Sequence, residues 1–398
     1  MKKYLLLFIM ALAVVIVSCE KTEDISVTNP DQVEFITHTE TVIPGQYIVM
    51  FEASNLKSVY KSKADADLAV LTKAQKISSA AKINLGEPKM VYSQTIEGVV
   101  VNISEKEAND LKYADDIVGV YPDKMVTLKK PGTLPSDPPE SPDQVVPYGI
   151  ERVGGGATYS GSHKAWIIDT GIDLDHPDLN VDVANGYLAE GIRAKSFDDD
   201  NGHGSHCAGI VGAYDNEIGV IGVAAGALVV PVKVLDKRGS GAYSAIIDGV
   251  EYVATNAASG DVANMSLGGG VYDPIDAAVE ALGEAGVLVA LAAGNESDDA
   301  NNHSPARANG PNLYTVSAMD INDDFAYFSN YGNPPIDYCA PGVSIFSCYK
   351  EGGFVTMSGT SMAAPHVCGL LLATNGNLST DGYVNGDPDG AADPIAVN

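Results

Sequence analysis

Basic residues are scarce in this chain of 398 residues. It carries 24 Lys and Arg against 52 Asp and Glu, which gives a formal net charge of -28. Because binding to a phosphate backbone needs clustered Lys and Arg, this balance argues against nucleic acid as a partner. The deficit is uneven, with a net charge of -5 over residues 1–147 and of -23 over residues 148–398. We therefore expect two units with different roles. The acidic residues of the second unit either keep the protein soluble or form oxygen-rich cation sites.

The apolar run near the N-terminus is too short to span a bilayer. It covers residues 5–17, which is 13 residues, and follows Lys2 and Lys3. This layout predicts an export signal over residues 1–19. The signal ends in Ile-Val-Ser-Cys, which is similar to a bacterial lipobox and would leave a lipid on Cys19. An ordinary secretory signal is the alternative.

Cysteine is also sparse, with five residues in the chain. An exported protein permits disulfides among the four that follow Cys19. Cys339 and Cys348 flank a turn at residues 340–342 that could bring them together. One bridge there is compatible with the sequence, which does not supply the geometry.

Residues 45–128 have the pattern of a small α+β domain. The patterns predict strands at 46–51, 99–103 and 117–121 and helices at 64–82 and 105–113. Before this domain, the polar residues 20–44 predict a tether. After it, six prolines within residues 129–147 predict an extended, exposed linker that a protease can cut.

From residue 148 to residue 398, apolar runs of strand length alternate with helical stretches. The runs are residues 165–168, 228–235, 262–267, 287–292 and 313–318, and the helical stretches are 205–213, 243–256, 275–285 and 361–373. Short β-branched runs separated by helices indicate an α/β fold, with a parallel sheet covered by helices on both faces. In such sheets, functional residues gather at the carboxyl ends of the strands.

Four polar residues follow strands or begin helices in this second region. Asp169 ends the strand Trp-Ile-Ile-Asp, and Asn295 follows the strand Leu-Ala-Ala-Gly. His203 lies between two glycines where a helix should start, and Ser361 opens another helix after a glycine-containing turn. Taken singly, each has an ordinary reading as a capping or turn residue. Together they are the acid, base, hydroxyl and amide donor that acyl transfer uses.

Three nearby residues offer competing interpretations. His366 lies five residues along the helix from Ser361 and points about 140° away from it, so the base must come from elsewhere, with His203 best placed. His203, His206 and Cys207 have a spacing that metal ligands use, but no second ligand cluster follows. We expect His206 and Cys207 to pack on the inner face of the helix.

Five blocks in the second region resemble signature sequences of the subtilisin-like (subtilase) family. They are IIDTGIDLDHPDL, NGHGSHCAGIVG, MSLGG, AAGNES and SGTSMAAPHV, in the family's order over about 200 residues. The form HGSHCAG is closest to the proteinase K-like branch. Residues 46–127 resemble more loosely the family's inhibitor prodomain, at QYIVMFE, IEGVVVNIS and IVGVYPD.

The resemblance implies a serine endopeptidase that hydrolyses peptide bonds through an acyl-enzyme. Asp169 would orient the imidazole of His203, which would act as general base and then as general acid. Ser361 would attack the scissile carbonyl, and Asn295 with the backbone N–H of Ser361 would form the oxyanion hole. The precursor would cut itself within residues 128–147, which releases the acidic catalytic domain from any lipid on Cys19.

The same resemblance implies the remaining sites and partners. Substrate backbone and side chains would bind to Ser240, Gly241, Ser266, Leu267, Gly268, Ala293 and Gly294. The chemistry would need no cofactor, while Asp320 with the carbonyls of Pro305 and Arg307 would hold a structural calcium ion. The expected partners are polypeptides and the chain's own prodomain, as chaperone and inhibitor, around a monomeric enzyme that meets a membrane only through its lipid.

Two departures from the family pattern stand out. Ser205 replaces the usual Thr, which is a mild change. A Gly- and Asp-rich tail, residues 379–398, stands where the family commonly has another helix. The sequence therefore does not predict what packs behind the helix that contains Ser361. Two other functions are a catalytically inactive binding lipoprotein and a metal-dependent hydrolase that uses His203 and His206. The intact set of four polar residues argues against the first.

Overall fold

The computed structural model describes residues 35–54, 59–129 and 143–398. The export signal, Cys19, most of the expected tether and residues 130–142 of the linker lie outside the described residues, so the predictions about them stay predictions. Within the described ranges, no helix combines the length and the apolar character that crossing a membrane requires.

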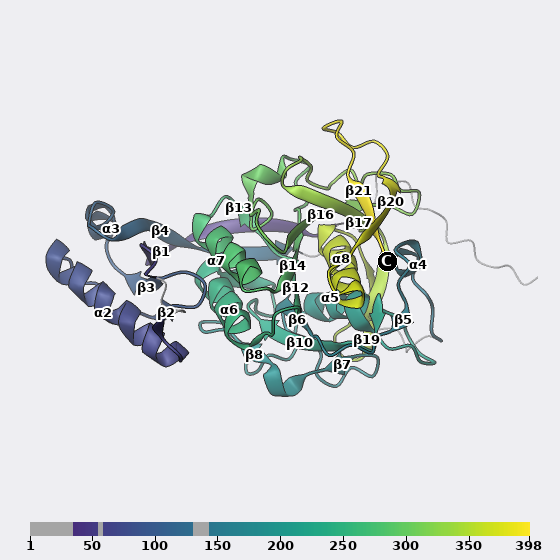
Figure 1. The fold of residues 1–398 in the computed structure, drawn as a ribbon, viewed down its shortest axis with the longest axis horizontal. Coiled ribbons are helices and arrows are strands. Elements are labelled where there is room, and N and C mark those ends of the chain that lie inside the picture. Colours follow the sequence, from purple (N-terminus) through teal and green to yellow (C-terminus); the bar gives the residue numbers. More distant parts are fainter. Residues whose placement is uncertain (1–34, 55–58, 130–142) are drawn as a thin grey trace, which may run out of the picture. The chain divides into compact units, whose positions relative to one another are not determined.

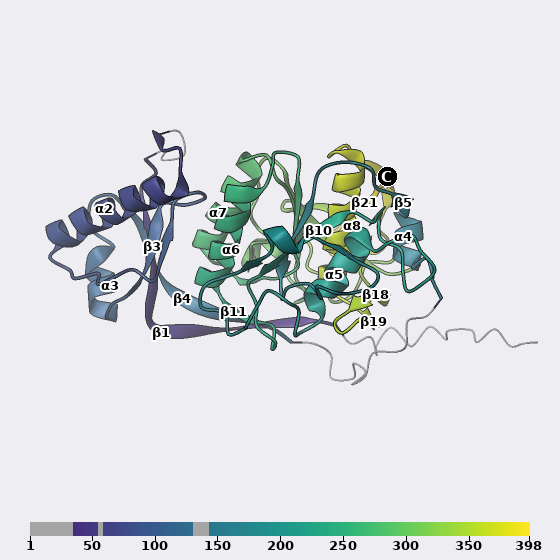
Figure 2. The same cartoon turned by 90° about the horizontal axis from the view of Figure 1, so that it is seen from below.

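The strands of the first region belong to a five-stranded antiparallel sheet. Its order is β11-β4-β1-β3-β2, and α2 and α3 pack on one face (Figures 1 and 2). The elements are β1 (Thr37–Phe51), α2 (Lys63–Ala81), β2 (Met90–Tyr92), β3 (Gly98–Asn102), α3 (Glu105–Leu111) and β4 (Ile117–Lys129). The edge strand β11 (Ser240–Ala242) comes from the second region. The predicted small α+β domain is confirmed.

Both faces of this sheet are buried, because alternate residues of a strand point to opposite sides. Val49 and Val99 pack against α2 in one apolar cluster. Their neighbours Ile48 and Val100 belong instead to the large core shared with the second region. The sheet therefore serves as a layer between its own helices and the rest of the protein.

The first strand begins earlier than expected. Residues 37–42 pair in antiparallel register with residues 129–124 of β4, from Thr37 opposite Lys129 to Val42 opposite Lys124. The prediction of a tether up to residue 44 is therefore wrong from residue 37 onward. The segment Thr-His-Thr-Glu-Thr is polar and lacks the apolar alternation of a strand, but β4, itself longer than predicted, supplies a partner for its backbone.

A ten-stranded sheet forms the second region. Its order is β20-β21-β17-β16-β14-β12-β6-β10-β7, with β8 also paired to β10, and all neighbours are parallel except β20 and β21. The strands are β6 (Ala165–Asp169), β7 (Asn180–Val181), β8 (Tyr187–Leu188), β10 (Leu228–Lys233), β12 (Val262–Met265), β14 (Leu288–Ala292), β16 (Leu313–Met319), β17 (Ile336–Pro341), β20 (Ser379–Tyr383) and β21 (Pro394–Val397).

Four long helices cover this sheet on both sides. They are α5 (His203–Gly212) with α8 (Thr360–Thr374) and α6 (Tyr243–Asn256) with α7 (Asp273–Glu284), and each pair packs together (Figure 1). The predicted α/β fold is confirmed. Helix α8 is apolar around its whole circumference and buried from its first residue to Leu372, as expected of a helix enclosed in a core.

Short elements complete the second region. They are α4 (Tyr148–Arg152), the strand pairs β5 (Ala157–Thr158) with β9 (Ala224–Ala225), β13 (Gly269–Gly270) with β15 (His303–Ser304) and β18 (Ile345–Tyr349) with β19 (Gly353–Met357), and the 3-10 turns Val183–Asn185 and Ala300–Asn302. The described end of the expected linker is attached, because Asp143 and Val145 form bridges with Ile218 and Val220.

The C-terminal tail extends the edge of the sheet. Strand β21 lies parallel to β17, with Ile395 opposite Cys339, and β20 folds back on β21. Inside this edge the hydroxyl of Ser317 donates to the buried carboxylate of Asp393 at 2.5 Å. These tail residues therefore form a strand pair, whereas the family commonly has another helix at this point of the chain.

The described cysteines are all free and buried, so the bridge considered between Cys339 and Cys348 is absent. Cys339 packs with Met319 and Ile395 in a small cluster at the sheet edge, whereas Cys348 belongs to the main core. The two thiols, on either side of the turn, therefore lie in different hydrophobic clusters.

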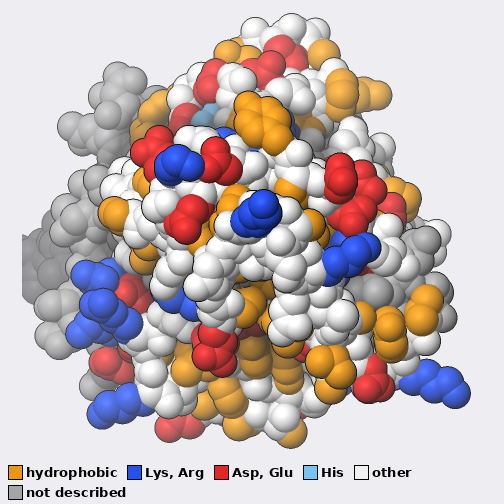
Figure 3. All heavy atoms as spheres, turned by 90° about the vertical axis from the view of Figure 1, so that its left-hand side faces the viewer, with side chains coloured by type: hydrophobic (Ala, Val, Ile, Leu, Met, Phe, Trp, Pro, Cys, Tyr) orange, Lys and Arg blue, Asp and Glu red, His pale blue; other side chains and the backbone are white. Residues whose placement is uncertain are grey.

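The outer face of the first region carries charges of both signs. Seen from the side of α2 and α3, Lys and Arg side chains alternate with Asp and Glu, and hydrophobic side chains are exposed between them (Figure 3). This mixture agrees with the small net charge of residues 1–147 and leaves most of the acidic excess on the second region.

Candidate active site

Asp169 and His203 form a buried hydrogen-bonded pair at the carboxyl end of β6. Nδ1 of His203 lies 2.8 Å from Oδ1 and 2.9 Å from Oδ2 of Asp169. Since a carboxylate accepts and does not donate, Nδ1 of His203 carries a proton. Nε2 is buried and has no hydrogen-bond partner within the described part of the chain. It is therefore the ring nitrogen able to accept a proton.

Asp199 holds the start of α5 in place. Its carboxylate accepts hydrogen bonds from the hydroxyl of Thr170, from the backbone N–H groups of Asn201 and Gly202, and from both the N–H and the hydroxyl of Ser205. These partners flank both members of the buried pair, so Asp199 ties their two segments together. We did not predict this role; the signal for it is the Asx-turn pattern Asp-x-Asn-Gly before the helix.

Ser361 is the second residue of α8 and is fully buried. Its hydroxyl donates to the carbonyl of Ser266 at 3.3 Å, and the hydroxyl of Ser266 donates to the carbonyl of Ser361 at 2.8 Å. The thiol of Cys207 lies 3.4 Å from that same carbonyl and 4.0 Å from Oδ2 of Asp169. Helix α8 therefore begins beside the Asp169–His203 pair.

Asn295 presents a free amide N–H group next to Ser361. Its Oδ1 accepts hydrogen bonds from the backbone N–H of Thr360 at 2.8 Å and from the hydroxyl of Thr360 at 3.0 Å. Its Nδ2 is buried without a partner in the described residues. A Cβ placed on Gly359 would lie 3.5 Å from this Nδ2 and 3.6 Å from the backbone nitrogen of Ser361. Two donors thus border the same point.

The predicted substrate segment at Ser240 and Gly241 already has a strand beside it. Ser240 and Gly241 pair in antiparallel register with Thr127 and Val126 of β4. The two hydroxyls of Ser240 and Thr127 lie 2.9 Å apart. The end of the first region therefore lies along the edge that was expected to bind a substrate backbone.

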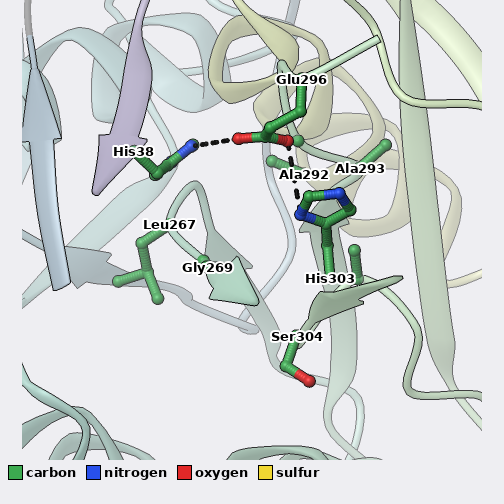
Figure 4. A pocket seen from close by; sticks show the side chains of 11 residues that line it. His38, Leu267, Gly269, Ala292, Ala293, Glu296, His303 and Ser304 are labelled. Carbon is green, nitrogen blue, oxygen red and sulfur yellow. Dashed lines mark hydrogen bonds and ion pairs between the residues drawn. The ribbon is translucent and has the colours of Figure 1, made fainter. Parts of the chain in front are cut away.

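Four of the predicted substrate residues, Leu267, Gly268, Ala293 and Gly294, line one pocket. Glu296 lies at its wall, with His38 and His303 pointing toward its carboxylate (Figure 4). Burial opposes ionisation of Glu296, but the hydrogen bond from His38 and the charges of the two imidazoles outweigh it and lower the pKa of Glu296 to about 2. Neither histidine was expected at this pocket.

His206 and His366 have structural roles. Nε2 of His206 donates to the carbonyls of Ile345 and Val355, both at 3.1 Å, and burial lowers the pKa of His206 to about 3. Nδ1 of His366 donates to the carbonyl of Met362 at 2.8 Å, one turn back in α8. His206 packs inward, as expected, and is not available as a metal ligand through Nε2.

The residues expected to bind calcium do not converge. Pro305 and Arg307 flank Ala306, whose carbonyl accepts a hydrogen bond from the hydroxyl of Thr315 at 2.8 Å. Asp320 lies five residues beyond Thr315, which is about 16 Å along an extended strand. Its carboxylate instead accepts N–H groups of the turn that it begins. This set does not fit a calcium ion, and the prediction is wrong because β16 separates its members.

Comparison with known families decides what this arrangement belongs to. Residues 166–379, more than half of the chain, match the profile of the Subtilase family. The chain belongs to the subtilase family. Residues 46–129 match Peptidase inhibitor I9, which agrees with the loose resemblance seen in the sequence. This subtilase is therefore a serine endopeptidase with an I9 domain ahead of it, and subtilases need no cofactor for catalysis.

Individual relatives cover most of the subtilase chain. Proteinase R of Parengyodontium album is 34% identical over 331 residues, which span 79% of this chain and 78% of that protein. Subtilisin-like protease 6 of Trichophyton soudanense is 36% identical over 363 residues, or 84% and 82% of the two chains. The crystal structure of a cold adapted subtilisin-like serine proteinase aligns with a TM-score of 0.52 and 33% identity, over 62% of this chain and 96% of the other.

Proposed function

We propose that Asp169, His203, Ser361 and Asn295 carry peptide-bond hydrolysis in this subtilase. The observation that supports it best is that Nε2 of His203 has no partner among the described residues, while Asp169 holds the opposite nitrogen of the ring. A ring held in this way accepts a proton at one defined atom.

The reaction starts with the hydroxyl of Ser361. It turns from the carbonyl of Ser266 to Nε2 of His203, gives up its proton there, and Oγ bonds to the carbonyl carbon of the substrate. Catalytic hydrogen bonds often form only in the complex with substrate, which agrees with the 3.3 Å contact to Ser266 in the free site. The oxyanion receives hydrogen bonds from Nδ2 of Asn295 and the backbone N–H of Ser361.

The intermediate then collapses. The C–N bond breaks, and the leaving amine takes the proton from His203, so that an acyl ester remains on Ser361. Water attacks this ester by the same route, giving its proton to His203, and His203 returns a proton to Oγ as the second product leaves. Asp169 keeps the ring in one tautomer and stabilises the imidazolium throughout.

The I9 domain acts as a product-like inhibitor of the same site. Its last strand, β4, uses the edge at Ser240–Ala242 that we assign to substrate. The chain continues from Lys129 into residues 130–142, and we place the self-cleavage within residues 128–147. We further propose export with a lipid on Cys19. The lipid then stays on the I9 side of the cut, and the catalytic domain is released into the periplasm or outside the cell.

One experiment tests these assignments. The wild-type chain and Ser361→Ala are expressed in a protease-deficient host, and a serine-directed phosphonate is applied to both after purification. We expect the wild type to mature and to carry the label on Ser361, with or without a chelator, while Ser361→Ala stays at full length and unlabelled. The peptidase activity of Ser361→Ala should be about 10⁶-fold lower than that of the wild type, as in the subtilisin triad.

Four outcomes would contradict parts of the proposal. A mutant that matures like the wild type rejects self-processing, and a label elsewhere rejects Ser361 as the nucleophile. Inhibition by a chelator without labelling would support a metal-dependent hydrolase instead. In the same cells, a mature domain found only with membranes would reject release from the lipid.

A further inference from the structure

Residues 35–42, called here the leading strand, lie outside the I9 match, which begins at residue 46. This segment nevertheless reaches the substrate cleft. Its residues 37–42 pair with residues 129–124 of β4, on the edge opposite to the one that pairs with β11. The strand β4 is therefore enclosed between β11 and the leading strand.

The leading strand starts next to Ser361. The backbone N–H of Ile36 donates to the carbonyl of Ser358 at 3.2 Å, three residues before Ser361. The ring of Phe35 stacks on Phe328, with centroids 4.8 Å apart. The main chain of the segment is thus attached to the loop that leads into α8.

His38 lines the pocket described above. Its Nδ1 lies 3.3 Å from Oε1 of Glu296, and its side chain is 5% exposed. In Figure 4 it faces one oxygen of the Glu296 carboxylate while His303 faces the other, and it lies above Leu267 and Gly269. A side chain of the leading strand therefore forms part of the wall of the pocket that we assign to a substrate side chain.

Glu40 provides a third attachment. Its carboxylate accepts from the hydroxyl of Tyr243 at 2.7 Å and pairs with Lys124 at 2.9 Å. It also lies directly over Gly269, where a Cβ would overlap with it. Residues 36, 38 and 40 thus face the catalytic region, while the alternate residues Thr39 and Thr41 are exposed, as the two-residue period of a strand requires.

We infer that the leading strand is a second inhibitory strand of the precursor. Its backbone lies between β4 and the Leu267–Gly270 segment and so closes the substrate cleft, and its His38 covers the pocket at Glu296. The inference rests on the proposed function, since it takes this cleft to be the substrate site. A substrate strand needs the backbone edge at Ser266–Gly268, and the leading strand covers the adjoining residues.

Hydrogen exchange in the uncut precursor tests the inference without depending on catalysis. Three full-length chains carry Ser361→Ala, one otherwise unaltered, one with His38→Asp and one with Thr39→Asp as the matched control. We expect slow exchange at residues 37–42 in the unaltered chain and in the control. Because His38→Asp sets a carboxylate against that of Glu296, exchange there should rise at least tenfold, the order of magnitude that two adjacent like charges produce.

Residues 46–51 serve as the internal reference, because they lie in the same β1 but within the I9 match. If His38→Asp makes this reference exchange quickly, the domain has unfolded and His38→Ser replaces it in the test. Fast exchange at residues 37–42 of the unaltered chain would overturn the inference, and so would His38→Asp behaving like Thr39→Asp.

A second measurement uses chains that keep Ser361. We expect His38→Asp to shorten several-fold the delay before casein is hydrolysed, with Thr39→Asp unchanged. Equal delays would reject an inhibitory role for the strand. Absence of hydrolysis in every chain would reject the proposed function, while the exchange result would still decide whether the strand is seated.

Discussion

In residues 143–398, particular side chains delivered by strand ends and helix starts meet at one place. Asp169 ends β6, His203 begins α5, Asn295 follows β14 and Ser361 lies in the first turn of α8. In residues 35–129, by contrast, β4 covers this place through backbone pairing with β11, and the leading strand adds a backbone hydrogen bond to Ser358 and the side chains of His38 and Glu40. The catalysis and the inhibition that we propose would therefore depend on different parts of the polypeptide and tolerate different substitutions.

This difference explains why one region has strong sequence motifs and the other has weak ones. A proton transfer needs a specific side chain at a specific atom, so the residues around it are restricted. A strand edge can pair with almost any sequence that extends, because every non-proline residue offers the same N–H and C=O groups. The I9 region is accordingly recognised at a few apolar strands, and the leading strand has no motif at all.

The largest effect should come from a side chain at the catalytic place. Asn295→Ala removes the Nδ2 donor, and we expect kcat to fall by about 10²–10³-fold, the order known for this donor in subtilisin, with KM nearly unchanged. Inhibition by the I9 region should stay the same. Steady-state kinetics on a peptide amide measures this, and a fall confined to KM would show that Asn295 binds the ground state instead.

An intermediate effect should come from Glu251, where a side chain of the second region meets backbone of the first. Its carboxylate, on α6, accepts the backbone N–H groups of Ser93, Gln94 and Thr95. Glu251→Ala leaves these groups unpaired at a buried contact, and we expect inhibition to weaken about 100-fold with kcat unchanged.

Titration of matured enzyme with its own released I9 fragment gives the inhibition constant of this variant. Glu284→Ala, an exposed residue of the neighbouring helix α7, is the matched control. If both variants are inhibited equally well, the contact at Glu251 does not hold the two regions together.

The smallest effect concerns the second region alone. Since Cys339 and Cys348 are free, a reducing agent should leave the melting temperature within about 1 °C, whereas a disulfide would typically contribute about 2–4 kcal/mol. Calorimetry with and without the reductant measures this. A drop of several degrees would show that the purified protein contains a bridge.

The parallel sheet was the easiest part to predict, because its strands are short apolar runs whose ends carry the motifs. Helix α6 was predicted at the residues it occupies, and α5 and α8 within two residues. The proximity of Asp169, His203, Asn295 and Ser361 followed from the rule that functional groups collect at carboxyl ends of parallel strands.

The remaining features depend on partners that are distant in sequence. Asp199 organises α5 through contacts that a run of three aspartates does not reveal, and His38 meets Glu296 across 258 positions. The calcium ligands were assigned by resemblance alone, and the length of β16 keeps Asp320 apart from Pro305 and Arg307. The start of β1 was missed since pairing with β4, not apolar alternation, makes it a strand.

The position of β4 between two partners has a consequence for how the enzyme becomes active. Both strands that cover the cleft belong to one compact domain, so a single cut within residues 128–147 leaves them linked. Two linked attachments hold at high effective concentration, because when one strand detaches the other keeps it close enough to rebind. Release by simple dissociation is then slow. The first matured molecules that digest the I9 domain of others would set the pace, and activation would accelerate with time.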